Sequence, residues 1–184
     1  MASFEPREFP IKGGSVVVRS ARPERAAAQL AFAREMYRTS PYVLTVPDEF
    51  TMTEEQEARF LRERLESPVA VFLNAEHGDE IVGSLDLAGR AKRKIAHQAL
   101  LGMGIAEGWR GRGVGDALMR AALEWATAHP TIEIVTLGVF AVNEPARKLY
   151  LRHGFVEFGR LPRALKQPEG GEFENIDMYK RVKA

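Results

Sequence analysis

The stretch Arg110-Gly111-Arg112-Gly113-Val114-Gly115 decides how this sequence folds and what it can bind. It stands between a strand-like run that ends near residue 106 and an apolar helical pattern that begins at Val114. Glycines at alternate positions let the backbone turn tightly and direct successive N–H groups toward one point. The start of the helix adds unpaired donors, and the two arginines add forked donors that match phosphate oxygens. The stretch therefore predicts an anion-binding loop suited to phosphate.

Two common nucleotide-binding loops are excluded at this position. A Walker loop ends in Gly-Lys-Ser or Gly-Lys-Thr, whereas this loop ends in Gly115-Asp116-Ala117. The spacing of the three glycines is not Gly-x-Gly-x-x-Gly, and the preceding strand belongs to a series of hairpins and not to a Rossmann unit. A plain glycine-rich turn with two solvated arginines is the simpler alternative.

Strand-like and helix-like segments alternate on both sides of the loop. Upstream, β-branched runs predict strands, and a capping box from Thr53 to Gln56 begins one of two helices. The expected segments are, in order, strand 16–19, helices 23–38 and 53–66, strands 69–75, 81–87 and 95–106, helix 114–129, strand 132–139, helix 143–153, and strands 155–161 and 173–182. This order, β-α-α-β-β-β-α-β-α-β-β, predicts an α/β (α+β) fold with a mixed, mostly antiparallel sheet flanked by helices.

Length and composition predict one domain. The chain has 184 residues, of which 45% are apolar, enough for one packed core of ordinary size. The first residues mix charge with Pro6, Pro10 and the pair Gly13-Gly14, a composition that favours irregular structure. We therefore expect residues 1–14 to be a loosely ordered leader and residues 15–184 to be a single domain.

Charge and cysteine content exclude several classes of function. The 26 basic and 25 acidic residues give a net charge of +1, so no overall field attracts nucleic acid or an anionic membrane. The basic turn from Arg90 to Lys94 lacks interleaved aromatic residues, which favours a solvated hairpin tip. The chain has no cysteine, which excludes disulfides and an enzyme-bound thioester. The histidines lack metal-ligand spacing, and no apolar run is long enough to span a membrane. These features predict a soluble, cytoplasmic protein without a metal.

Two motifs in the second half of the chain carry a family resemblance. The first, Arg-x-x-Gly-x-Gly, starts at Arg110 and follows a predicted strand. The second, Asn-x-x-Ala-x-x-x-Tyr-x-x-x-Gly-Phe, starts at Asn143. Together they resemble the two signatures of the GNAT superfamily of acyl-CoA-dependent N-acetyltransferases, and the order of elements outside residues 95–160 also agrees with that superfamily. The resemblance implies a GNAT-type fold with acetyl-CoA as co-substrate.

The resemblance also assigns the residues that bind acetyl-CoA. The pyrophosphate would lie on the loop, held by main-chain N–H groups and by Arg110 or Arg112. The pantetheine arm would pair with the edge of the strand at residues 103–105, where two strands diverge. A carboxylate at Asp116 repels phosphate, so its side chain should point away. The full set is Met103, Gly104, Ile105, Arg110, Gly111, Arg112, Gly113, Val114, Gly115, Asp116, Asn143 and Ala146.

Asn143 and Tyr150 are seven residues apart, so a helix places them on one face, two turns apart. A helix cap and a buried aromatic residue are the simpler interpretation. The resemblance instead implies that Asn143 contacts the pantetheine or the sulfur region and that Tyr150 is the general acid that protonates the leaving thiolate. A strand N–H near Ile105 would hold the oxygen of the tetrahedral intermediate. Glu107 and Asp86 are candidates for the base that deprotonates the amine, although most lone carboxylates are simply solvated.

The predicted function is N-acetyl transfer directly from acetyl-CoA to a primary amine, through a ternary complex. The acceptor would be an amino acid, a small amine or a protein N-terminus, and it should enter from the face built by the first two helices and residues 161–175. One of the acidic residues near the end of the chain, Glu172, Glu174 or Asp177, would steer a cationic amine. The alternatives are a non-catalytic acyl-CoA-binding module or sensor and, more remotely, nucleic-acid binding. We expect a small-molecule or peptide amine as partner, no nucleic acid and no membrane, and a homodimer is compatible with the resemblance.

Overall fold

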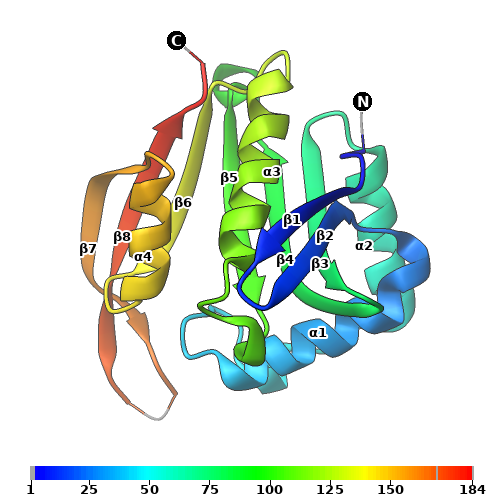
Figure 1. The fold of residues 1–184 in the computed structure, drawn as a ribbon. Coiled ribbons are helices and arrows are strands. Elements are labelled where there is room, and N and C mark those ends of the chain that lie inside the picture. Colours follow the sequence, from blue (N-terminus) through cyan, green and yellow to red (C-terminus); the bar gives the residue numbers. More distant parts are fainter. Residues whose placement is uncertain (1–2, 169, 184) are drawn as a thin grey trace.

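The computed structural model describes residues 3–168 and 170–183, which form eight strands and four α-helices (Figure 1). The strands are β1 (Arg7–Ile11), β2 (Gly14–Ser20), β3 (Ala70–His77), β4 (Glu80–Gly89), β5 (Gln98–Ile105), β6 (Ile134–Phe140), β7 (Val156–Lys166) and β8 (Glu172–Arg181). The helices are α1 (Ala26–Thr39), α2 (Glu54–Glu66), α3 (Val114–Ala128) and α4 (Glu144–Arg152). None of the described helices is long and apolar enough to cross a membrane.

All eight strands form one sheet in the order β1-β2-β3-β4-β5-β6-β8-β7. Neighbouring strands are antiparallel apart from β5 and β6, which are parallel because α3 connects them as a crossover. The last strand of the chain, β8, therefore lies between β6 and β7. The prediction of a mixed, mostly antiparallel sheet flanked by helices is confirmed.

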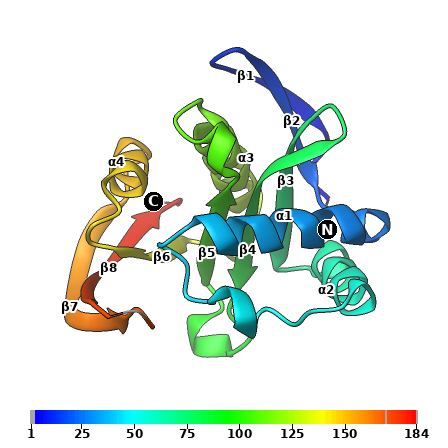
Figure 2. The ribbon, with the colours of Figure 1, turned by 90° about the horizontal axis from the view of Figure 1, so that it is seen from below.

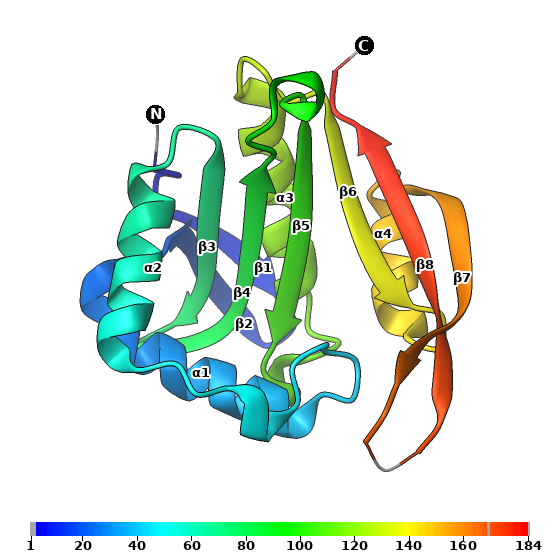
Figure 3. The ribbon, with the colours of Figure 1, turned by 180° about the vertical axis from the view of Figure 1, so that it is seen from behind.

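The sheet opens between its two parallel strands. β5 and β6 pair only from Gln98 opposite Ile134 to Leu100 opposite Thr136. Beyond that point β5 stays paired with β4, and β6 stays paired with β8, so the two strands diverge toward their C-terminal ends (Figure 3). The facing edges are thereby left with unpaired backbone N–H and C=O groups. We call this opening, between residues 101–105 of β5 and 137–140 of β6, the strand gap.

The helices cover the two faces of the sheet unequally. α3 and α4 lie on one face, and α1 and α2 lie on the other, where they cover the half of the sheet that contains β3 and β4 (Figure 2). No described helix lies over β6, β8 and β7 on the side of α1 and α2 (Figure 3). The main core fills the space under α3, whose buried positions include Leu118, Met119 and Trp125. One half of the sheet is therefore covered on both faces and the other half on one.

Residues 7–11 form a strand, which contradicts the prediction of a loosely ordered leader for that part of residues 1–14. β1 pairs with β2 through a turn in which Gly13 and Gly14 have φ of +88° and +145°. Phe9 is buried in the main core, and β1 is an edge strand, where Pro10 is tolerated. The expected domain boundary at residue 15 thus falls inside a hairpin, while residues 1–2 and 184 lie outside the described residues.

Every other predicted element is present, in the predicted order and within a few residues of its expected bounds. The largest difference at a strand start is in β5, which begins at Gln98 and not at residue 95. Residues Arg93–Ile95 form a short 3-10 turn instead. The helix that follows the glycine-rich loop begins at Val114, as predicted.

Candidate active site

The glycine-rich loop lies at the start of α3, directly after the end of β5. Gly111 and Gly113 have φ of +71° and +102°, a conformation that favours glycine. Within residues 3–168 and 170–183, the N–H groups of Gly111, Arg112 and Gly113 donate to no backbone carbonyl. The first N–H groups of α3 are also unpaired, because a helix leaves them without partners. These donors fit the phosphate groups of coenzyme A.

The two loop arginines are already engaged by the protein. The Nε atom of Arg110 donates to the carbonyl of Ile105 at 3.1 Å, and its other nitrogens donate to Thr39. The guanidinium of Arg112 lies 4.9 Å from the centre of the Trp109 ring. Arg110 thus ties the end of β5 to the end of α1. In this arrangement the main-chain N–H groups of the loop are the donors left for an anion, and a role of the loop or of either arginine in phosphate binding stays a prediction.

Gly115 brings α4 against the start of α3. A Cβ atom at this position would lie 3.0 Å from Leu149 on α4 and 3.6 Å from Met103 on β5. A side chain here would therefore push apart the loop, the strand and the helix that carries Asn143 and Tyr150. Gly115, the third glycine of the loop, therefore allows α3 to pack closely against α4 and β5.

The carboxylate of Asp116 also joins α3 to α4. One oxygen lies 2.8 Å from Nε2 of His153, and the other lies 2.8 Å from Nε of Arg120. With both oxygens engaged beside the helices, the side chain does not enter the glycine-rich loop. This agrees with the expectation that it points away from a bound phosphate.

Asn143 and Tyr150 lie on α4 as the sequence predicts, and each also has the simpler structural role. The Oδ1 atom of Asn143 accepts a hydrogen bond from the N–H of Ala146 at 3.3 Å and so caps the helix, and its amide N–H₂ donates to no residue that the structure describes. Tyr150 is only 6% exposed, with its ring centre 5.9 Å from that of Phe155. Burial raises the pKa of Tyr150 to about 12. Tyr150 therefore stays protonated near neutral pH, and its role as the general acid stays a prediction.

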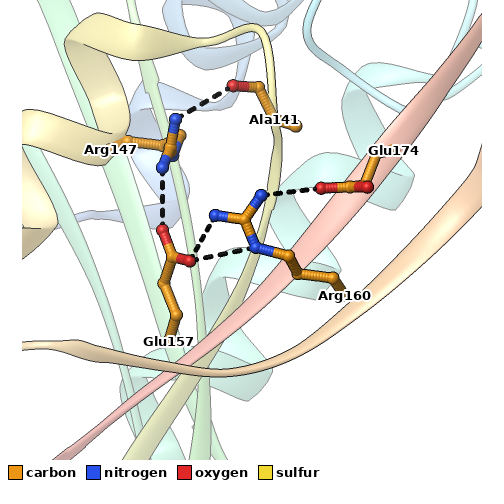
Figure 4. Close-up of polar contacts among 5 residues, drawn as sticks. All are labelled: Ala141, Arg147, Glu157, Arg160 and Glu174. Atoms are coloured by element: carbon orange, nitrogen blue, oxygen red, sulfur yellow. Dashed lines mark hydrogen bonds and ion pairs between the residues drawn. The ribbon is translucent and has the colours of Figure 1, made fainter.

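A chain of charges that the sequence analysis missed positions the segment before α4 (Figure 4). Arg147 donates to the carbonyl of Ala141 at 3.4 Å and to Glu157 at 2.8 Å. Arg160 binds the other oxygen of Glu157 and also Glu174. The hydrogen bonds from Arg147 and Arg160 lower the pKa of Glu157. The network fixes the segment that carries Asn143 relative to β7 and β8, and only the strand register brings its members together.

The two candidate bases differ in their surroundings: Asp86 is paired with an arginine, and Glu107 is exposed to solvent. Asp86 accepts two hydrogen bonds of 2.9 Å from Arg64 of α2, and burial raises its pKa in spite of this partner. The bidentate pair joins α2 to the sheet, which disfavours Asp86 as a base. Glu107 is exposed in a 3-10 turn (Glu107–Trp109) just beyond β5. Its role as a general base stays a prediction.

The face of the strand gap opposite α3 and α4 is built from distant segments of the chain. The ring of Tyr42, which follows α1, lies 6.0 Å from that of Phe140 at the end of β6. Phe140 in turn lies 6.2 Å from Phe173 of β8. Gln167 donates to the carbonyl of Pro41 at 2.9 Å and so joins the β7–β8 hairpin to the segment after α1. We call the three rings the aromatic wall.

No cluster of three or more potential metal-ligating side chains occurs in the part of the chain that the structure describes. His129, which is buried, is used structurally: its ring nitrogens bond to the carbonyl of Pro68 and to the N–H groups of Thr131 and Ile132.

Known proteins share both the sequence motifs and the fold. The model of the acetyltransferase (GNAT) family matches residues 30–155, more than half of the chain. The L-amino acid N-acetyltransferase AaaT of Escherichia coli (strain K12) is 33% identical over 76 residues, which cover 41% of this chain and 47% of that protein. The chain thus matches about half the length of that curated relative.

Solved structures resemble the whole fold. A GNAT-family acetyltransferase from Streptococcus pneumoniae has a TM-score of 0.87 at 26% identity, covering 90% of this chain and 99% of that one. The structure of yncA from Salmonella typhimurium, which contains its cofactor acetyl-CoA, has a TM-score of 0.81 at 14% identity, covering 92% of this chain and 95% of that one. The second likeness concerns the fold alone. Because the family match includes both the glycine-rich loop and the helix of Asn143 and Tyr150, the chain belongs to the acetyltransferase (GNAT) family.

Proposed function

We propose that the protein transfers an acetyl group from acetyl-CoA directly to a primary amine while both substrates are bound. The observation that carries the proposal is the strand gap, which opens beside a loop of unpaired main-chain donors. The donors suit the phosphates of coenzyme A, and the unpaired edge of β5 suits an extended pantetheine arm. The acetyl-CoA in the yncA structure and the amino-acid acetyltransferase named among the relatives support the same assignment.

In this proposal, different residues carry out the separate steps of acetyl transfer. The N–H groups of the glycine-rich loop bind phosphate, and the edge of β5 near Ile105 supplies an N–H to the oxygen on which negative charge develops. The amine loses one proton to a base, for which Glu107 remains the candidate, and attacks the thioester carbonyl carbon. The carbon–sulfur bond breaks, Tyr150 gives its proton to the leaving thiolate, and the second proton, which the nitrogen loses as it becomes an amide, restores Tyr150 through solvent. Burial raises the pKa of Tyr150 and makes it a weaker acid, whereas a dry site also raises the pKa of the departing thiol and makes its thiolate a stronger base, so the two effects oppose each other.

Direct transfer predicts a kinetic order. The chain has no cysteine to hold an acetyl group, so both substrates must be bound before thiol is released. Initial rates measured over a grid of acetyl-CoA and amine concentrations should give intersecting double-reciprocal lines. Parallel lines, or acetylated protein recovered after incubation with acetyl-CoA alone, would contradict direct transfer.

The rival function is a non-catalytic acyl-CoA-binding module. A thiol-release assay with a panel of amines, amino acids and short peptides separates the two, because a binding module releases no thiol above the rate without protein. We further propose a small-molecule or peptide amine as the partner and the cytoplasm as the location, as expected from the composition. A homodimer stays a prediction that light scattering of the purified protein can test.

A further inference from the structure

A row of paired residues crosses the strand gap on the face that lacks helices over β6 and β8. Gly102 on β5 pairs with Asp86 on β4, and Gly138 on β6 pairs with Asp177 on β8. Continuing the parallel register by two residues beyond Leu100 and Thr136 sets the two glycines on facing edges of the gap. The row therefore has two glycines at its centre and one carboxylate on each side.

Both glycines leave space above the strands. Their neighbours Leu101 and Leu137 are buried on the side of α3, so the glycines face the opposite side, and both are exposed. A Cβ atom at Gly102 would meet nothing within 4 Å, and one at Gly138 would lie 3.2 Å from Asn175 and 3.6 Å from the carboxylate of Asp177. We call the two residues the glycine floor. Glycine at position 138 keeps the Asp177 carboxylate uncovered.

Asp177 differs from the other carboxylates of this half of the sheet. β7 and β8 carry four acidic residues, and three of them have basic partners: Glu157 with Arg147 and Arg160, Glu174 with Arg160, and Glu172 with Arg163 and Lys166. Asp177 forms no ion pair with any residue that the structure describes. It is half-buried, and its side-chain hydrogen bond comes from the amide of Asn175 at 2.8 Å. A half-buried carboxylate held by a neutral group is a ready partner for a cation.

The surroundings define which cation fits. Across the glycine floor, the charge of Asp86 is matched by Arg64, so the row keeps one unmatched negative charge. A carboxylate on the ligand would be repelled there. Next to Asp177, Phe140 pairs with Asn175 and belongs to the aromatic wall, which offers an apolar surface. The site thus combines a negative charge with aromatic rings, and these suit an ammonium attached to an apolar group.

We propose that Asp177 binds the ammonium of the acceptor above the glycine floor and selects apolar primary amines that lack a carboxylate beside the amine. The inference rests on the proposed function and names the acceptor class for that site. Asp177 acts in binding, because the attacking nitrogen must lose a proton after it has bound. An arylalkylamine, or the amino end of a peptide that begins with an apolar residue, meets these requirements, whereas a free amino acid does not.

Three probes with the same ring test the proposal: 2-phenylethylamine, phenylalanine amide and phenylalanine. The wild-type protein should prefer the amine and the amide to the acid by tenfold or more in kcat/KM. In Asp177→Asn, which keeps the shape of the side chain and removes its charge, KM for 2-phenylethylamine should rise roughly ten- to a hundredfold. The KM for acetyl-CoA should stay constant, kcat should change by less than about threefold, and the preference over phenylalanine should shrink. Asp177→Glu should recover part of the loss.

Glu80→Gln is the control, because it removes the same charge from an exposed strand position, at the start of β4, that lies outside the residues assigned to the acceptor. Its acceptor KM should stay within about twofold of the wild type. An unchanged KM in Asp177→Asn, or phenylalanine as the best of the three acceptors, would overturn the inference and leave the proposed function intact. Failure of the proposed function looks different: no amine of the wider panel would release thiol, although acetyl-CoA still binds in calorimetry.

Discussion

The two faces of the sheet at the strand gap are built by different means. On the face of α3 and α4 the residues of the site are held by close packing: Gly115 lies against Leu149, and Tyr150 is buried in the core. On the other face, over β6 and β8, the site consists of uncovered space and a carboxylate without a basic partner. In the proposed function, the first side would bind acetyl-CoA through backbone groups that packing holds in place. The second side would bind the acceptor in a space that no side chain fills. Substitutions on the first side should affect stability and cofactor binding, and those on the second should affect the acceptor alone.

The largest effect is expected where the packed face supplies chemistry. Tyr150→Phe keeps the ring in the core and deletes the proton donor, so kcat should fall roughly ten- to a thousandfold. Affinity for acetyl-CoA, measured by calorimetry, should change little, and so should the melting temperature. Full turnover in this variant would show that Tyr150 only packs.

Gly113→Val tests whether acetyl-CoA binding depends on the positive φ angle of residue 113. Valine at φ +102° is strained by about 1–3 kcal/mol, and its side chain would stand close to Ile11 and to a bound pyrophosphate. We expect acetyl-CoA to bind roughly ten- to a hundredfold more weakly, together with a lower midpoint in urea. Gly108→Ala is the control, since its Cβ meets nothing within 4 Å and it lies before the loop. Equal losses in both variants would argue against a specific role of Gly113.

Two glycines on the same side of β5, Gly104 and Gly102, allow a direct comparison of a position that α1 covers with one that nothing covers. A Cβ at Gly104 would lie 3.1 Å from Met36 of α1, whereas one at Gly102 meets nothing. Gly104→Ala should therefore lower the melting temperature. Gly102→Ala should leave it unchanged or slightly higher, yet raise the acceptor KM severalfold, up to about tenfold, because the methyl group occupies the glycine floor. Unchanged kinetics in Gly102→Ala would mean that no substrate uses this space.

The smallest effect concerns how pH changes the stability of the protein through the buried hydroxyl of Tyr150. The pKa of Tyr150 is raised from about 10 to about 12, so its contribution to stability is complete below pH 10 and is lost as pH rises from 10 toward 12. Near pH 11 the loss should be about 1 kcal/mol. Urea unfolding at pH 8 and pH 11 should show this difference in the wild type and a smaller one in Tyr150→Phe. An equal loss of unfolding free energy between pH 8 and pH 11 in both proteins would show that the hydroxyl of Tyr150 is exposed to water.

Local patterns in the sequence predicted most of the fold, including the helices that carry the candidate residues on the packed side. The loop, the helix at Val114, and the pair Asn143 and Tyr150 depend on turn chemistry and helical spacing, which are readable within a few residues. β1 was missed because a short segment with Pro6 and Pro10 has little strand character of its own. It is held by distant contacts, such as the bond of 2.8 Å from the N–H of Lys12 to the carbonyl of Arg112.

The open side of the site could not be predicted as a unit. Asp177 was among the acidic residues considered, but its place opposite Gly138 depends on the pairing of β6 with β8, and an irregularity between Glu157 and Gly159 shifts the next strand. The side chain of Arg110 donates to Ile105 and Thr39, contacts that spacing along the chain does not predict, and the expected role of Arg110 or Arg112 in phosphate binding stays a prediction. Register and side-chain direction are decided by the packed chain and not by spacing along it.

The position of β8 has a consequence for the order of assembly during synthesis. Strand β8 separates β6 from β7 and supplies Asp177, so neither neighbour can pair with it until residues 172–181 have been made. A growing chain can build β1 to β5 with α1 and α2 earlier, because those contacts lie within its first part. The proposed acceptor site therefore cannot form before β8 has been made. A ribosome-bound chain that stops before residue 172 would leave β6 and β7 as unpaired edges, which are prone to aggregate.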